Sequence, residues 1–160
     1  MIRLTDQYLW NFIFSVFFLV LVVMGAIVLH SESRIAVADL TITDFLLITL
    51  ATWRLVRLFV YDAITKFFRE QFWDAKLLKT KVILEKPARG PRRTIADLLS
   101  CPWCFGVWAG AVVTFFYLYT PYAFFPVLFL AVSAVATFLQ LLSNLVGHRA
   151  EQAKLETEKK

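Results

Sequence analysis

Apolar residues gather in four long runs along this chain, at roughly residues 8–30, 40–60, 102–119 and 122–146. Each run is close to the ~20 residues that a helix needs to cross a hydrocarbon core of about 30 Å. A soluble fold of 160 residues would leave too much of this surface in water. The pattern therefore predicts an all-α integral membrane protein with four transmembrane helices.

The domain organisation follows from these runs, because only short segments remain between them. We expect one four-helix membrane domain over residues 1–147 and a charged cytoplasmic tail over residues 148–160. The first apolar run is longer than the apolar core of a secretory signal, so we interpret it as an uncleaved anchor. Hydrophobic residues make up 59% of the chain, well above an ordinary globular protein, which agrees with this class.

Basic residues are distributed unevenly around the runs. If the N-terminus is cytoplasmic and all four runs cross, all but three of the 17 Lys and Arg side chains face the cytoplasm; the exceptions are Arg34, Arg54 and Arg57. The positive-inside rule therefore places both termini and the central loop in the cytoplasm. Because the basic residues adjoin the spans, the expected partner is the anionic inner leaflet, with no nucleic acid.

The segment after the second run is amphipathic. Ile64, Phe68, Phe72 and Ala75 share one helical stripe, which predicts a helix lying in the headgroup plane. The basic loop from Lys66 to Asp97 should then rest on the membrane surface.

Two signals mark where the chain becomes helical again. Thr94-Ile-Ala-Asp97 matches a capping box and predicts a helix start. Pro102 then either follows a short helix that ends near Ser100 or kinks one continuous helix.

The sharpest motif is Cys101-Pro-Trp-Cys104, at the start of the third run. Two cysteines three residues apart on a helical turn can form a dithiol or share a metal ion, and a helix N-terminus lowers a thiol pKa. A zinc site needs about four ligands, and His148 is the one further candidate on this face. The alternative is structural: Pro102 starts a helix, and Trp103 and Trp108 anchor it at the interface.

Arg54 and Arg57 lie within the second run, where a charged side chain is costly and functional by default. Both can extend to the headgroups, and Asp62 or Asp97 can pair with them. Binding a lipid phosphate or another small anion is the functional alternative.

Small residues indicate where helices meet. Gly106 and Gly110 form a G-x-x-x-G pair, and Ser133 and Thr137 lie one turn apart in the fourth run. Such positions let two backbones approach closely. Packing inside the monomer is favoured over a homo-oligomer, because three other helices are available.

Two stretches together resemble a known family. They are Ala51-Thr-Trp-Arg-Leu-Val-Arg-Leu-Phe-Val-Tyr-Asp62 and Leu98-Leu-Ser-Cys-Pro-Trp-Cys-Phe-Gly-Val-Trp108. The chain is similar over about residues 44–140 to small bacterial membrane proteins catalogued as domain of unknown function 1360, some of which carry a sporulation-protein label. The resemblance implies a bacterial cytoplasmic membrane, and it groups six residues in one shared feature: Arg54, Arg57, Asp62, Cys101, Cys104 and Trp108. It implies no activity.

The sequence thus favours a non-enzymatic, multi-pass component whose cytoplasmic face binds anionic lipid or a partner protein. We expect no cofactor, because catalytic triads, phosphate-binding glycine loops and paired intramembrane carboxylates are missing. A thiol-dependent redox protein or sensor and a holin-like pore-forming protein are the alternatives.

Overall fold

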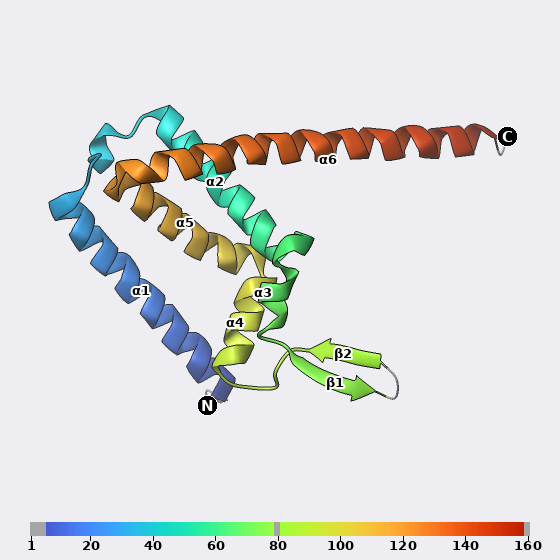
Figure 1. The fold of residues 1–160 in the computed structure, drawn as a ribbon, viewed down its shortest axis with the longest axis horizontal. Helices are drawn as coiled ribbons and strands as arrows, with labels where there is room; N and C mark the ends of the chain where they lie inside the picture. Colours follow the sequence, from blue (N-terminus) through green and yellow to red (C-terminus); the bar gives the residue numbers. More distant parts are fainter. Residues whose placement is uncertain (1–5, 79–80, 159–160) are drawn as a thin grey trace, which may run out of the picture.

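The computed structural model of the chain describes residues 6–78 and 81–158. Within these ranges helices dominate, and one antiparallel hairpin interrupts them (Figure 1). The elements in chain order are α1 (Asp6–Glu32), η1 (Val37–Asp39), α2 (Ile42–Val60), η2 (Ala63–Thr65), α3 (Lys66–Glu70), β1 (Asp74–Leu78), β2 (Lys81–Glu85), α4 (Pro91–Ser100), α5 (Pro102–Tyr119), η3 (Pro121–Ala123) and α6 (Phe124–Glu158).

Each of the four apolar runs forms a helix, as predicted. Three helical segments, α1, α5 and Pro121–Thr157, are long and apolar enough to cross a membrane. The helix α2 is not among them, because three of its 19 residues are charged: Asp44, Arg54 and Arg57. The fold is therefore that of a membrane protein with three such helices in the described residues, and a fourth crossing stays a prediction.

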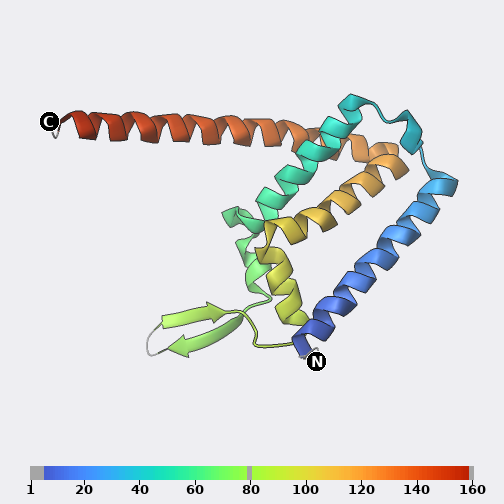
Figure 2. The same ribbon diagram turned by 180° about the vertical axis from the view of Figure 1, so that it is seen from behind.

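The core lies where α2 meets α5 and α6. Its buried residues come from all three helices: Ile48 and Ala51, then Val113, Tyr117 and Leu118, then Val127. The buried side chains of Ala109, Ala131 and Ala134 are small, so the helix axes can lie close together. Both views show α2 beside α5 and crossed by α6 (Figures 1 and 2).

Gly106 and Gly110 of α5 face α2. A Cβ atom added at Gly106 would lie 3.5 Å from Val56, and one at Gly110 would lie 3.6 Å from Thr52. Both glycines therefore bring α5 against α2, whereas Ser133 and Thr137 lie on α6.

The first helix lies outside this core, and none of its residues is buried. It touches α5 at a few places, where Phe18 packs on Trp108 with ring centres 4.7 Å apart and Gly25 lies against Phe115. Just beyond α1, the backbone N–H of Arg34 donates to the carbonyl of Leu118 at 2.9 Å. The exposed apolar surface of α1 is what a helix surrounded by lipid requires.

The segment predicted as one amphipathic helix has a different structure. It is split into η2, the five-residue α3 and the start of β1. Extended backbone at Asp62 separates it from α2, and Phe72 lies in the turn before β1. The paired strands align Ala75 with Leu84 and Lys76 with Ile83, so the alternation of strands replaces the helical stripe from Asp74 onward.

The predicted start of α4 at Thr94 is wrong by one turn. The helix begins at Pro91, after Gly90 at a φ of 95°, a left-handed conformation that favours glycine. Proline at the first helical position needs no backbone donor, which explains this start. The break at Pro102 is the first of the two predicted alternatives, since α4 ends at Ser100 and α5 begins at Pro102.

The last helix does not end at the predicted domain boundary. It continues from Phe124 through Gly147 to Glu158, and its final part extends away from the other helices (Figures 1 and 2). Its 35 residues correspond to a rod of roughly 50 Å at 1.5 Å per residue.

The contact between α2 and α5 can be tested at Gly110. We expect Gly110→Ala to leave stability unchanged or slightly improved, because a Cβ fits at ordinary contact distance from Thr52 and alanine favours helix. Gly110→Leu should destabilise the protein by about 1–3 kcal/mol, because its larger side chain overpacks the contact. Thermal unfolding of both variants in the same detergent gives the comparison, and equal melting temperatures would contradict the packing described.

Candidate functional site

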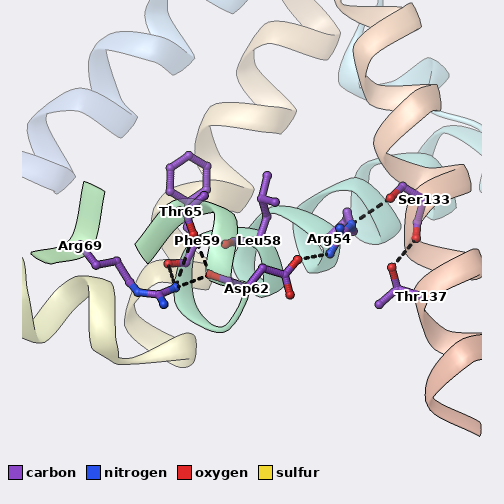
Figure 3. Close-up of polar contacts among 8 residues, drawn as sticks. All are labelled: Arg54, Leu58, Phe59, Asp62, Thr65, Arg69, Ser133 and Thr137. Atoms are coloured by element: carbon purple, nitrogen blue, oxygen red, sulfur yellow. Dashed lines mark hydrogen bonds and ion pairs between the residues drawn. The ribbon is translucent and has the colours of Figure 1, made fainter. Parts of the chain in front are cut away.

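Arg54 connects two helices through its half-buried side chain. Its Nη1 donates to the Asp62 carboxylate at 2.8 Å, and its Nε donates to Ser133 Oγ at 2.9 Å (Figure 3). The Arg54 side chain is 17% exposed and that of Asp62 is 27% exposed. A charge this far from water is tolerated when it is paired and hydrogen-bonded, so Arg54 ties the end of α2 to α6.

Arg69 of α3 binds the backbone carbonyls at the C-terminal end of α2. Its Nη1 donates to the carbonyl of Phe59 at 2.8 Å and to that of Asp62 at 3.2 Å, and the Thr65 hydroxyl donates to the carbonyl of Leu58 (Figure 3). The last carbonyls of a helix lack partners inside the helix and carry partial negative charge. Arg69 and Thr65 satisfy them, which turns the chain back after α2.

Arg57 lies one helical turn after Arg54 but in a different environment. It lines an opening of about 560 Å³ between α2 and the start of α5, the Arg57 groove, whose lining residues are Trp53, Val56, Arg57, Tyr61, Pro102, Trp103, Gly106 and Val107. The Arg57 Nε atom is buried and has no hydrogen-bond partner in the part of the chain that the structure describes. The groove thus combines a guanidinium group with three aromatic side chains.

The two cysteines lie at the junction of α4 and α5, and both are free thiols. Cys101 caps α5, where its Sγ accepts a hydrogen bond of 3.3 Å from the backbone N–H of Cys104. Hydrogen bonds from the side chain and backbone of Cys104 lower the pKa of Cys101, and Lys86 adds a smaller electrostatic contribution in the same direction. Cys101 is therefore the more readily ionised thiol of the pair.

A second opening, of about 660 Å³, lies between α1 and the α4–α5 junction. We name it the dithiol cavity, and its lining residues are Asn11, Phe14, Ser15, Phe18, Leu19, Lys86, Thr94, Asp97, Leu98, Ser100, Cys101, Cys104, Val107 and Trp108. Its volume is within the range of small-molecule sites.

Asp97 does not pair with either arginine of α2. It accepts from Lys86 and from Arg93, each at 2.8 Å. Burial alone would raise the pKa of Asp97, but these two hydrogen bonds outweigh it and hold the pKa below the ordinary value of 3.8. The carboxylate therefore joins Lys86 to α4, and Asp62 is the acid that pairs with Arg54.

The two predicted interface anchors, Trp103 and Trp108, have different surroundings. Trp103 is 85% exposed at the start of α5, as an interfacial side chain can be, whereas Trp108 packs on α1. Among the described residues, no group of three or more His, Cys, Asp or Glu side chains can hold a metal ion. Arg57 and the two cysteines line separate openings at the start of α5, and Arg54 lines neither of them.

Sequence reasoning did not find two polar contacts. The Tyr117 hydroxyl donates to the carboxylate of Asp44, whose other oxygen belongs to a capping box with Thr41. The Thr94 hydroxyl donates to Asn11 Oδ1 at 2.9 Å and accepts from Gln7 at 2.8 Å. The capping box could be read locally from Thr41 and Asp44, but the contacts of Tyr117 and Thr94 join residues more than 70 positions apart.

Comparison with known proteins identifies relatives for most of the chain. The profile of the family described as "Protein of unknown function (DUF1360)" matches residues 47–143. The chain is 31% identical over 108 residues to UPF0713 protein YngL of Bacillus subtilis (strain 168), covering 68% of this chain and 82% of that protein. It is 32% identical over 104 residues to Sporulation protein YjcA of the same organism, covering 60% of this chain and 86% of that protein. No solved structure matches.

The pair of Arg54 and Asp62 gives the first prediction for this site. In a double-mutant cycle with Arg54→Gln and Asp62→Asn, we expect a coupling energy of about 1–3 kcal/mol, as is typical of a charge-assisted hydrogen bond away from bulk water. Denaturant unfolding of the four proteins in detergent measures this energy. Additive effects of the two substitutions would show that the contact contributes nothing.

The pairing of Asp97 predicts a dependence of stability on acid pH. Because the folded-state pKa is lowered, the stabilisation is present above about pH 3.8 and is lost as the pH falls through the folded value. Asp97→Asn should therefore be less stable at pH 7, by less than about 1 kcal/mol for this half-exposed group, and should lose less stability than the wild type below pH 4. Melting temperatures measured between pH 7 and 3 test this, and parallel curves would contradict it.

Proposed function

The chain belongs to the DUF1360 family of proteins of unknown function, and we propose from its own geometry that it is a non-enzymatic membrane component whose Arg57 groove binds an anionic lipid. The observation that carries this proposal is the buried Nε of Arg57, which lacks a partner among the described residues. A lipid phosphate supplies an acceptor that matches the guanidinium in charge and in geometry.

The proposal includes four membrane crossings with both termini in the cytoplasm. Charges within α2 do not prevent a crossing, because Arg54 is paired with Asp62 and Asp44 is bonded to Tyr117. The Arg57 groove then lies at the cytoplasmic end of α2, beside the start of α5. The positive-inside rule supports this orientation for a bacterial cytoplasmic membrane.

The aromatic side chains of the groove support a lipid over a soluble anion. Trp53 and Trp103 are exposed, and Tyr61 at the end of α2 is 59% exposed. Tryptophan and tyrosine favour the level of the headgroups, where their rings contact acyl chains and their polar atoms face water. A phosphate on Arg57 with its acyl chains along these rings satisfies both the charge and the apolar surface.

Arg54 does not compete for this role. Its Nε and Nη1 donors are already bound to Ser133 and Asp62, so it has fewer donors to offer a ligand than Arg57. Of the two arginines of the shared motif, Arg54 thus stabilises the packing of the helices, and Arg57 binds the lipid.

The proposal predicts different results for two arginine substitutions. Arg57→Gln should reduce binding of phosphatidylglycerol roughly 10- to 100-fold, which corresponds to the ~1.5–3 kcal/mol of a hydrogen bond to a charged group. Arg92→Gln removes an equal charge on α4 outside the groove and should leave this binding within about twofold. Native mass spectrometry of the detergent-solubilised protein, titrated with phosphatidylglycerol and with phosphatidylcholine, gives both affinities.

Two other outcomes would contradict the lipid proposal, and each has its own interpretation. Equal loss with both substitutions would indicate nonspecific attraction to the basic surface. Unchanged affinity of Arg57→Gln would exclude the groove as the lipid site and would favour a partner protein as its ligand.

A further inference from the structure

The helix α1 forms one wall of the dithiol cavity and is otherwise exposed. None of the residues of α1 is buried, and Phe14, Ser15, Phe18 and Leu19 form the wall of the cavity on this helix. In a membrane the surroundings of α1 are acyl chains. A ligand that enters here comes from the bilayer and carries apolar surface.

The other end of the cavity is polar but electrically balanced. Lys86 and Asp97 both line it and are joined to each other at 2.8 Å. The Asn11 Oδ1 atom accepts from Gln7 and Thr94, which leaves its amide N–H groups as donors at the cavity wall. Such surroundings suit a neutral headgroup with hydrogen-bond acceptors, rather than an ion.

Aromatic side chains form part of the cavity wall between the two ends. Trp108 of α5 and Phe18 of α1 both line the cavity and meet with ring centres 4.7 Å apart. Aromatic walls of this kind bind planar rings by stacking.

Both cysteines line the same cavity. They are three residues apart at the start of α5, with the Cys101 sulfur at hydrogen-bond distance from the backbone of Cys104. A dithiol in this position is a two-electron donor that faces the ligand space. The proposed lipid site at Arg57 makes no use of these thiols.

We propose that the dithiol cavity binds an isoprenoid quinone from the bilayer, and that the quinone oxidises Cys101 and Cys104 to a disulfide. The class of ligand follows from the cavity: a neutral planar ring with two carbonyl acceptors, an apolar tail that leaves along α1, and the capacity to accept two electrons. A phospholipid fits the tail but provides neither the ring nor the oxidising group.

The reaction balances without a further reagent. The Cys101 thiolate adds to a ring carbon of the quinone and forms a carbon–sulfur bond. Cys104, as thiolate, then attacks the Cys101 sulfur, forming the disulfide and breaking the carbon–sulfur bond with its electron pair left on the ring. The two protons of the thiols end on the two ring oxygens, so the quinone is reduced to quinol as the two thiols are oxidised. Reducing thiols of the cytoplasm would restore the dithiol, so the pair would report the oxidation state of the quinone pool.

The test uses the full-length protein in lipid nanodiscs with a decyl-tailed benzoquinone as oxidant. Disulfide formation is followed by differential alkylation with mass spectrometry, and quinol formation by absorbance. We expect one quinol for each disulfide in the wild type, and no quinol with Cys101→Ala or with Cys104→Ala. Absence of disulfide in the wild type after prolonged incubation would overturn the proposal.

Two tryptophan substitutions on α1 test whether the cavity is the site of reaction. Ser15→Trp fills the cavity and should slow oxidation by the quinone at least tenfold, while oxidation by the soluble reagent diamide keeps its rate. Val16→Trp adds the same ring on the neighbouring, 41% exposed residue outside the lining and should react like the wild type. Equal quinone rates for Ser15→Trp and the wild type would place the reaction elsewhere.

A measurement on the wild type covers the case in which Ser15→Trp fails to fold. An azido-substituted quinone, activated by light in the nanodisc, should attach to residues of the cavity wall on α1 and α5, and excess decyl quinone should suppress the label. Labels confined to the apolar surface of α6 would contradict the site. None of these readouts depends on Arg57, so the lipid proposal and the quinone proposal can fail separately.

Discussion

The ion pair between Arg54 and Asp62 is the contact on which the arrangement of the other helices depends. A guanidinium group within an apolar bundle costs several kcal/mol unless its donors are satisfied. Here one donor reaches past the end of its own helix to Asp62, and another reaches Ser133 on α6. The same side chain therefore fixes where α2 ends and where α6 crosses it.

This constraint explains why α2 is central although three of its 19 residues are charged. Its polar groups are directed at neighbours: Asp44 at Tyr117 of α5, and Arg54 at α6. Its small residues face the same neighbours, since Ala51 is fully buried and Thr52 lies against Gly110. By contrast, α1 has polar residues near its two ends and presents exposed apolar side chains between them. A helix whose polar side chains need hydrogen-bond partners is packed between other helices, and a helix without such side chains can face the lipid.

Features set by one helix could be predicted from the sequence, and features set by contacts between helices could not. The four apolar runs follow from composition, and the sequence limits Pro102 to a break or a kink and the acid partner of Arg54 to Asp62 or Asp97; contacts in the fold decide between these alternatives. The hairpin at residues 74–85 was missed, because Phe68, Phe72 and Ala75 have helical spacing while Arg69 turns the chain back onto the end of α2. The start of α4 was misplaced because Thr94, a good cap by type, bonds to Asn11 of α1 instead. The division between Arg54 and Arg57 depends on Ser133 and on the groove, neither of which spacing along α2 reveals.

The position of α5 decides what the shared arginine and cysteine motifs can do together. Val107, in its second turn, lines both openings, the Arg57 groove towards α2 and the dithiol cavity towards α1. The wall between the two sites is therefore only one helix thick, and Cys101 and Pro102 at its start each line one of them. A disulfide between Cys101 and Cys104 would constrain this first turn, because Cys101 could no longer adjust its position as the cap of α5. Trp103, in the same turn, lines the Arg57 groove, so the turn that holds the two thiols also forms part of the proposed lipid site.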